Sequence, residues 1–442
     1  LLLSMQKFAS QCTNLGISFG AVPKLSELHE QQADEQLRYN IQIIRLWSII
    51  AAVLGFLFCI VASPLMNEVS FTWGDHTLHY AMLAISVAMM AVTGGETAIM
   101  KATRQLGKLA RTQIYTVIAT LIVSVPLYYF YGHSGVVPAI VLIAFATMLI
   151  TIAYSYRTFP FRFDFRRSML REGAGMIRLG LAFVFAAAVG SASEMAIRAY
   201  LNVVGSLDEV GLYNAAFMIT ITYAGMVFSA MESDFFPRLS GVASDIEATN
   251  NTVNKQIEVS LLLLAPMLVA LLMSLPLLIP MLFSSEFLPV VGMAQVAVLA
   301  MYFKVLTLPV AYITLARRQS LPYLVLETSY FVVLIVAIVM GYRLWGIWGT
   351  GVAIVIAHVA ENFFVTGYAT WKFDYRTTSS VMRYAAIQMT IGFAAYAVTL
   401  LTDGRLYWIT EAALTIVSTA YSVHILRQKT HLWERLRSKL RI

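Results

Sequence analysis

Long apolar runs separated by short polar stretches fill almost the whole chain. A run of about 20 apolar residues can cross a bilayer as a helix. The runs are continuous rather than alternating, which is not the pattern of a transmembrane β-barrel. The pattern predicts an all-α polytopic membrane protein with spans near residues 1–22, 43–66, 78–100, 113–131, 136–155, 176–201, 211–236, 257–283, 290–315, 320–342, 345–371, 382–401 and 406–426.

The composition agrees with a chain that is solvated largely by lipid. Hydrophobic residues make up 59% of the sequence and charged residues 12%, whereas soluble domains carry about 25% charged residues. The two cysteines, Cys12 and Cys59, both lie in apolar stretches. This usage argues against a disulfide framework and against a thiolate metal site.

The lysines and arginines are distributed unevenly between the predicted loops. Alternate loops and the C-terminal tail hold 26 of the 31, the opposite loops hold only Arg343 and Arg405, and Lys7, Arg198 and Lys304 lie within spans. The positive-inside rule places the basic loops in the cytoplasm. The net charge of +7 therefore requires no nucleic-acid partner.

Two basic segments are expected to lie on anionic lipid headgroups: "FRFDFRRSMLREGAGMIR" (161–178) and the amphipathic "HLWERLRSKLRI" (431–442). The loops on the opposite side are short and offer no extracytoplasmic domain for a catalytic site. We therefore expect a protein that is not an enzyme.

The chain repeats itself with a shift of 214 residues. Pro23-Lys24-Leu25-Ser26 matches Pro237-Arg238-Leu239-Ser240, and the same shift aligns Arg104-Gln105 with Arg318-Gln319 and Gly132 with Gly346. One register that links polar, glycine and proline positions indicates an internal duplication. At each Pro-basic-Leu-Ser we expect the proline to end a helix and the cation to lie at its C-terminal end.

The duplication predicts the domain organisation. We expect two parallel six-helix repeats, with the first helix missing from this chain, plus two extra helices, which gives 14 transmembrane helices in the full protein. The predicted parts are an N-lobe of helices 2–6 (1–160), a C-lobe of helices 7–12 (161–375), helices 13–14 (376–426) and a basic amphipathic cytoplasmic tail (427–442). Two matched halves are the layout of alternating-access transporters.

Three segments carry a resemblance to a known family. "GLYNAAFMITITYAGMVFSAMESDFFPRLSGV" (211–242), "LLLSMQKFASQCTNLGISFGAVPKLSEL" (1–28) and "SEMAIRAYLNVVGSLDEVGLYNAA" (193–216) resemble bacterial polysaccharide-unit flippases. These are the O-antigen and lipid-linked oligosaccharide members of the multidrug/oligosaccharidyl-lipid/polysaccharide exporter superfamily. In this resemblance Arg198 occupies a place where such proteins often carry an intramembrane cation.

The resemblance implies a two-lobed transporter of the bacterial inner membrane. Such a transporter moves an undecaprenyl-pyrophosphate-linked oligosaccharide from the cytoplasmic to the periplasmic leaflet, among membrane lipids and beside a polysaccharide polymerase and chain-length machinery. Alternatives within the superfamily are a lipid II flippase and a drug/cation antiporter. A polysaccharide polymerase or ligase is a further alternative, but it would need a sizeable extracytoplasmic loop.

Charged side chains within the spans are the candidate functional groups, because each costs about 2.5–3.5 kcal/mol at mid-bilayer on insertion scales. Lys304, Arg198 and Lys7 would offer cations to a pyrophosphate in a central cavity, and Gln11 and Asn14 would bond sugars. The alternatives are a buried ion pair for Lys304, a pair with Glu194 for Arg198, and interhelical bonds for the amides.

The candidate coupling or gating groups are Glu194, Glu361, Glu96 and Glu232. A carboxylate that changes protonation would couple transport to H⁺, or it would bind Na⁺. A structural ion pair is the alternative for each of them. His358, three residues before Glu361, is interpreted as a packing residue. No P-loop, dinucleotide fingerprint or metal-ligand spacing is present, so we predict no cofactor.

Overall fold

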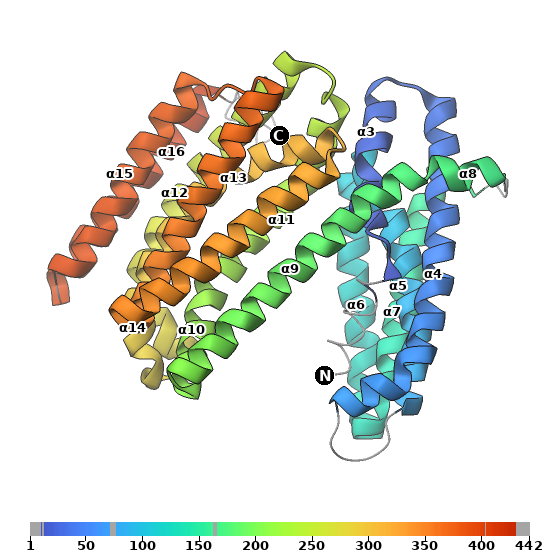
Figure 1. The fold of residues 1–442 in the computed structure, drawn as a ribbon, viewed down its shortest axis with the longest axis horizontal. Helices are drawn as coiled ribbons and strands as arrows, with labels where there is room; N and C mark the ends of the chain where they lie inside the picture. Colours follow the sequence, from blue (N-terminus) through green and yellow to red (C-terminus); the bar gives the residue numbers. More distant parts are fainter. Residues whose placement is uncertain (1–9, 11–12, 71–76, 162–165, 403, 430–442) are drawn as a thin grey trace, which may run out of the picture. The chain divides into compact units, whose positions relative to one another are not determined.

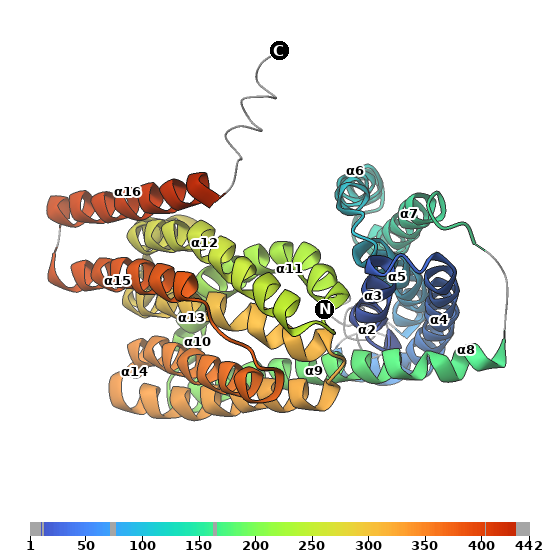
Figure 2. The same cartoon turned by 90° about the horizontal axis from the view of Figure 1, so that it is seen from above.

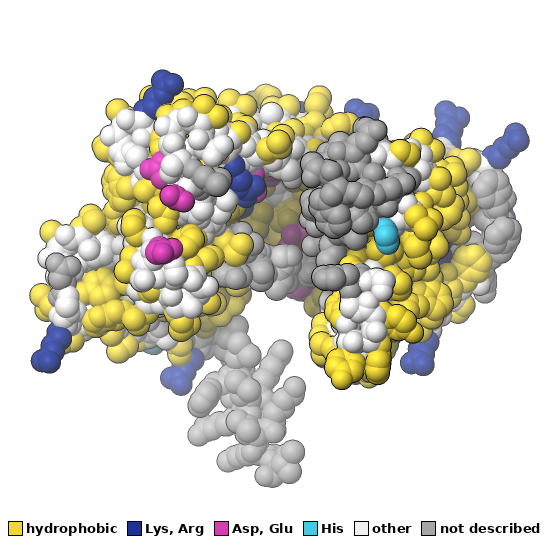
Figure 3. Space-filling model, turned by 90° about the horizontal axis from the view of Figure 1, so that it is seen from below, with side chains coloured by type: hydrophobic (Ala, Val, Ile, Leu, Met, Phe, Trp, Pro, Cys, Tyr) yellow, Lys and Arg dark blue, Asp and Glu magenta, His cyan; other side chains and the backbone are white. Residues whose placement is uncertain are grey.

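The helices of a computed structural model follow the predicted spans closely. The structure describes residues 10, 13–70, 77–161, 166–402 and 404–429, and every element in them is a helix. Ten of these helices are long and apolar enough to span a membrane within the described residues. Apolar side chains form large patches on the described part of the face shown in Figure 3, as expected of a multi-pass membrane protein.

The chain divides into two compact units. Unit 1 comprises Leu1–Ala187, Ser233–Ala243 and Leu315–Leu324, and unit 2 comprises the rest. In unit 1, α5 packs against α4 and α7, and α6 packs against α7 (Figure 1). Its elements are α2 (Ile17–Gly20), α3 (Val22–Glu30), α4 (Asp34–Ser70), α5 (Thr77–Ala102), α6 (Leu106–Tyr131), η1 (Gly132–Gly135), α7 (Val136–Tyr156), α8 (Arg167–Glu172) and the first part of α9 (Ala174–Val204).

Unit 2 is built around α12, which packs along both α15 and α16 (Figure 2). Its elements are the end of α9, α10 (Leu207–Phe217), η2 (Met218–Thr222), α11 (Tyr223–Gly241), α12 (Ile246–Leu282), η3 (Ser285–Val290), α13 (Val291–Ala316), α14 (Ser320–Phe373), α15 (Ser379–Leu401) and α16 (Gly404–Lys429). Parts of α11, α13 and α14 belong to unit 1.

The backbone repeats the landmarks of the 214-residue shift. Arg104 (φ 54°) and Arg318 (φ 57°) both adopt the left-handed conformation between consecutive helices. Gly132 (φ 53°) ends α6, and Gly346 (φ 60°) makes the kink in α14 that separates the predicted spans 320–342 and 345–371. The helices α4 and α12 each contain 37 residues.

Both of these helices begin before the predicted spans, at Asp34 and Ile246. Their polar first turns lie outside the apolar runs from which the spans are predicted. In each of them an asparagine amide donates to the carbonyl four residues earlier: Asn40 to Gln36 (2.9 Å) and Asn254 to Asn250 (2.8 Å). Asn254 also donates to the Arg376 carbonyl (2.9 Å) and thereby fixes the α14–α15 connection in unit 2.

Two expectations about helix continuity are wrong. Pro237 does not end its helix, because α11 continues to Gly241. Pro23 lies in the first turn of α3, where the missing N–H has no intrahelical acceptor in any case. The predicted span 211–236 is interrupted by the π-helix η2, a local widening that apolar periodicity does not reveal.

Within the described part of the predicted span 1–22, the helix is broken at Leu15 (φ 51°) and Gly16 (φ 62°). A Cβ atom on Gly16 would lie 2.0 Å from the Gly180 carbonyl oxygen, and one on Gly180 would lie 2.3 Å from the Leu15 carbonyl oxygen. Gly16 and Gly180 therefore allow the backbone just before α2 to contact the backbone of α9 directly.

Gly180→Ala tests this contact. We expect it to lower the free energy of unfolding by about 1–3 kcal/mol, the usual range for overpacking, because the new methyl group meets a backbone that cannot move aside. Gly175→Ala in the same helix is the control, since its Cβ would meet no atom within 4 Å. Equal thermal stabilities of the two variants in detergent would contradict the close approach.

Candidate functional site

An ion pair between two long helices is the central feature of unit 2. Lys304 lies midway along α13, and its Nζ donates to Oε1 of Glu361 in α14 at 3.1 Å. The Lys304 side chain is 24% exposed and that of Glu361 only 4%. The pair therefore neutralises a cation that would be costly alone inside a membrane, while part of the Lys304 side chain stays exposed.

Three further side chains of α14 surround the pair. Glu327 interacts electrostatically with both Lys304 and Glu361. The Tyr330 ring centre lies 5.6 Å from Lys304 Nζ and 5.0 Å from the His358 ring centre. His358 is 2% exposed, and its Nδ1 lies 2.9 Å from the Ile354 carbonyl oxygen, which fits the packing role expected of it.

One carboxylate oxygen of Glu361, the buried Oε2, has no hydrogen-bond donor among the described residues. The neighbouring Asn362 donates to Thr307 Oγ1 at 3.0 Å and makes a second polar bond between α14 and α13. A buried acceptor without a donor is unfavourable, so Oε2 is a place where a proton or a small cation would be stabilised.

A second ion pair lies on α9. Arg198 Nη2 donates to Glu194 Oε2 at 3.0 Å, and Arg198 Nε donates to Asn214 Oδ1 at 2.7 Å. Both charged side chains are 40% exposed. Tyr330 interacts electrostatically with Glu361 and with Glu194, so the two pairs share one neighbourhood. We call Glu194, Arg198, Lys304, Glu327 and Glu361 the unit 2 charge cluster.

Sequence reasoning selected four of these five residues and missed Glu327. It lies within the predicted span 320–342, so the rule that selects charges inside apolar runs was sufficient to find it. Asn214 was missed as well, because a single amide near a span end carries no such signal.

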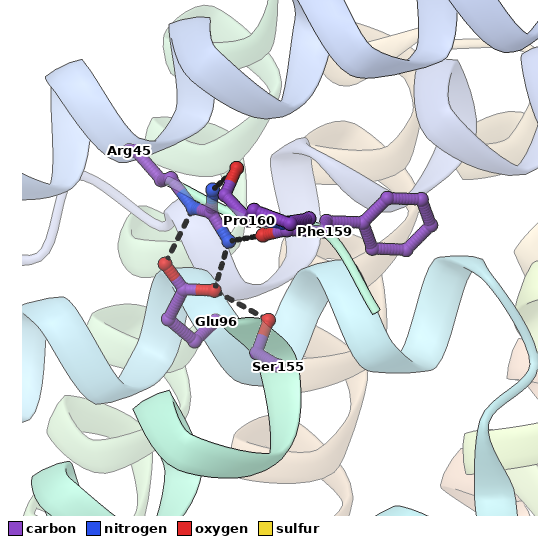
Figure 4. A network of polar contacts seen from close by, with 5 residues as sticks. All are labelled: Arg45, Glu96, Ser155, Phe159 and Pro160. Atoms are coloured by element: carbon purple, nitrogen blue, oxygen red, sulfur yellow. Dashed lines mark hydrogen bonds and ion pairs between the residues drawn. The ribbon is translucent and has the colours of Figure 1, made fainter. Parts of the chain in front are cut away.

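Glu96, a second candidate coupling residue, belongs to a buried network in unit 1 (Figure 4). Arg45 Nε donates to Glu96 Oε1 at 2.8 Å, and Ser155 Oγ donates to Glu96 Oε2 at 2.5 Å. Arg45 also donates to the carbonyls of Phe159 (2.8 Å) and Pro160 (3.3 Å). The network joins α4, α5 and the end of α7, and it satisfies Arg45 and Glu96 with groups of unit 1 alone.

The remaining candidates lie elsewhere or outside the described residues. Asn14 Nδ2 donates to Ser18 Oγ at 3.1 Å, and both side chains pack over Gly94, which favours an interhelical role for the amide. Glu232 lies in α11 and is partly exposed. Lys7 and Gln11 fall outside the described residues. Among those described, no group of three His, Cys, Asp or Glu residues is placed to hold a metal ion.

Solved structures with the same architecture identify the fold. One is an outward-facing multidrug resistance MATE family transporter of the MOP superfamily, with a TM-score of 0.70 at 12% identity over 84% of this chain and 87% of that one. A MATE protein in the bent conformation gives 0.71 at 13% over 87% of both chains. A MOP superfamily transporter from Pyrococcus furiosus gives 0.68 at 12% over 84% and 86%. The chain has the MOP fold.

The sequence itself identifies the family. The family model described as "Polysaccharide biosynthesis protein" matches residues 5–292, more than half of the 442 residues. The chain belongs to this family, as the resemblance in its sequence predicts. The matched range includes Glu194 and Arg198 and ends before Lys304 and Glu361. A search of curated proteins finds no match.

Glu96→Gln tests the network in unit 1. Removing one partner of a buried ion pair leaves the other charge uncompensated and costs about 3–5 kcal/mol. We expect a loss of that order in the free energy of unfolding, measured by thermal or denaturant unfolding in detergent.

Asp374→Asn is the matched control for Glu96→Gln. It removes the partner of Arg376 in a pair whose side chains are 80% and 61% exposed, and such surface pairs contribute about 0–1 kcal/mol. A Glu96→Gln variant as stable as the control would show that the buried network does not hold unit 1 together.

Proposed function

We propose that this protein is an alternating-access transporter that moves an undecaprenyl-pyrophosphate-linked oligosaccharide from the cytoplasmic to the periplasmic leaflet of a bacterial inner membrane. The oligosaccharide would be an O-antigen or exopolysaccharide repeat unit. A polysaccharide polymerase and its chain-length machinery would act on the product. In this proposal the protein transports its substrate without chemical change.

Family and fold support this proposal independently. Membership of a polysaccharide biosynthesis family agrees with a saccharide cargo, and the MOP fold is that of transporters. The landmarks repeated at Arg104 and Arg318, and at Gly132 and Gly346, support an internal duplication into two six-helix repeats with two additional helices. Related halves are the arrangement that alternating access requires.

The observation that carries the proposal is the Lys304–Glu361 pair. A lysine midway along a membrane helix is expensive and marks a functional site more often than a structural one. The Lys304 side chain is still 24% exposed although a carboxylate neutralises its charge. Arg198 is more exposed still. The two cations would bind the two phosphates of the headgroup. Arg198 would donate two N–H groups to one phosphate, and Lys304 would act as a point charge on the other.

The same pair offers a route to ion coupling. Glu361 competes with an anionic substrate for Lys304, because both would occupy the same ammonium group. A proton or Na⁺ bound at Glu361, whose Oε2 has no donor among the described residues, would release Lys304 to the pyrophosphate. Cation binding and substrate binding would then strengthen each other by the same factor.

The charge balance of the cluster favours one alternative. Glu194, Glu327 and Glu361 outnumber Lys304 and Arg198, and an excess of carboxylates suits an organic cation. A drug/cation antiporter is therefore the second candidate. A lipid II flippase would share the pyrophosphate chemistry proposed here, so the cluster does not separate it from the first candidate.

Transport by the reconstituted protein tests the proposal. Proteoliposomes should move a labelled undecaprenyl-pyrophosphate oligosaccharide between leaflets, and Lys304→Gln and Arg198→Gln should each slow the movement at least about tenfold, equivalent to one lost charged contact of about 1.4 kcal/mol. Lys255→Gln, an exposed cation outside the cluster, should transport normally.

Two results would contradict the assignment. Normal rates in both cluster variants would remove the site from the transport mechanism. Movement of a labelled organic cation, with none of the lipid-linked sugar, would favour the antiporter.

A further inference from the structure

A cavity of about 680 Å³ lies within unit 1, away from the unit 2 charge cluster. Its walls come from four segments: the α2–α3 junction, α4, the α8–α9 junction and the connection between α13 and α14. These segments all adjoin the basic loops that the charge distribution assigns to the cytoplasmic side.

Three cations line the cavity. Lys24, Arg178 and Arg318 share the lining with one carboxylate, that of Glu172, which accepts a hydrogen bond from the Tyr39 hydroxyl at 3.2 Å. Lys24 and Arg318 both pair with Glu27, so one acidic side chain is shared between them. Among the described residues, no acidic side chain pairs with Arg178. The cavity therefore has an uncompensated positive charge.

Backbone donors add to this charge. Gln319 and the first turn of α14, Ser320–Pro322, follow Arg318 in the chain and also line the cavity. The N–H groups of Ser320 and Leu321 have no intrahelical acceptors, Pro322 has no N–H, and the helix dipole is positive at this end. A helix start combined with three cations is a favourable environment for phosphate groups.

Apolar side chains also line the cavity. Ile43, Ile44, Leu179 and Leu321 contribute hydrocarbon surface. Gly175 also lines the cavity, and a Cβ at this position would meet no atom within 4 Å. A cavity lined by both cations and apolar side chains fits a molecule with an anionic head and a hydrocarbon tail better than it fits a free anion.

We propose that this cavity binds the phosphate or pyrophosphate headgroup of a membrane lipid on the cytoplasmic side. The occupant is either a polyprenyl pyrophosphate, which would then be captured here before transport, or an anionic phospholipid of the bilayer. The two share the chemistry that the cavity recognises. Because binding is measured without transport, this inference can fail while the proposed function holds, and the reverse is equally possible.

Native mass spectrometry of the full chain in detergent tests the inference. Undecaprenyl pyrophosphate, phosphatidylglycerol, phosphatidylcholine and inorganic pyrophosphate are titrated separately. Arg178→Gln removes the cation without an acidic partner, and Gly175→Leu fills the cavity without a backbone clash. The matched controls outside the lining are Lys255→Gln, an exposed cation in α12, and Gly107→Leu in α6, where a Cβ also meets no atom within 4 Å.

We expect at least one of the two anionic lipids to bind, and to bind about tenfold more weakly to Arg178→Gln and Gly175→Leu than to the two controls. Selective binding of undecaprenyl pyrophosphate would support substrate capture. Selective binding of phosphatidylglycerol would support a bilayer lipid as the occupant.

Equal binding to all four variants would overturn the inference. Equally tight binding of phosphatidylcholine would overturn the role of charge. Inorganic pyrophosphate that binds as tightly as either lipid would overturn the assignment to a lipid headgroup.

Discussion

A lysine in the middle of a membrane helix needs a counter-charge on a neighbouring helix, and this constraint governs unit 2. The Lys304–Glu361 bond ties α13 to α14, and the Asn362–Thr307 bond joins the same helices beside it. Glu327, Tyr330 and His358 complete the surroundings from α14. In unit 1 the buried cation is neutralised in a different way. The side chains of Arg45 and Glu96 are only 5% and 3% exposed, and among the described residues all their hydrogen bonds are made with groups of unit 1. The unit 1 pair is fully buried, whereas the unit 2 pair keeps a partly exposed lysine side chain and a carboxylate oxygen that accepts no hydrogen bond from the described residues.

Much of the fold could be predicted from the sequence, because lipid leaves the backbone few choices. Apolar runs located α5, α7, α13 and α15 within a few residues. The 214-residue shift located Arg104 and Arg318, two positions that share an unusual backbone conformation. The polar extensions of α4 and α12, the π-helix η2 and the break at Leu15–Gly16 were missed. They depend on hydrogen bonding and close packing, neither of which changes the hydropathy of a run.

The charged residues of the candidate site could be predicted from the sequence, but which of them pair with one another was less predictable. Charges inside apolar runs selected Lys304, Arg198, Glu194 and Glu361, which lie in one neighbourhood of unit 2. The same rule selected Glu96, which lies instead in the network with Arg45. The cavity lined by Lys24, Arg178 and Arg318 was not predicted from the sequence. Its cations lie in α3, at the start of α9 and in the α13–α14 connection, and only the fold shows that they line one cavity.

Replacing the pair by apolar residues, Lys304→Met together with Glu361→Leu, tests the central claim most directly. A buried ion pair exchanged for hydrocarbon of similar size often leaves a protein as stable or more so. The double variant should therefore unfold at a temperature no lower than the parent and yet fail to move the labelled lipid-linked oligosaccharide in proteoliposomes. Transport at the parental rate by the stable double variant would show that these charges hold helices together and take no part in moving the substrate.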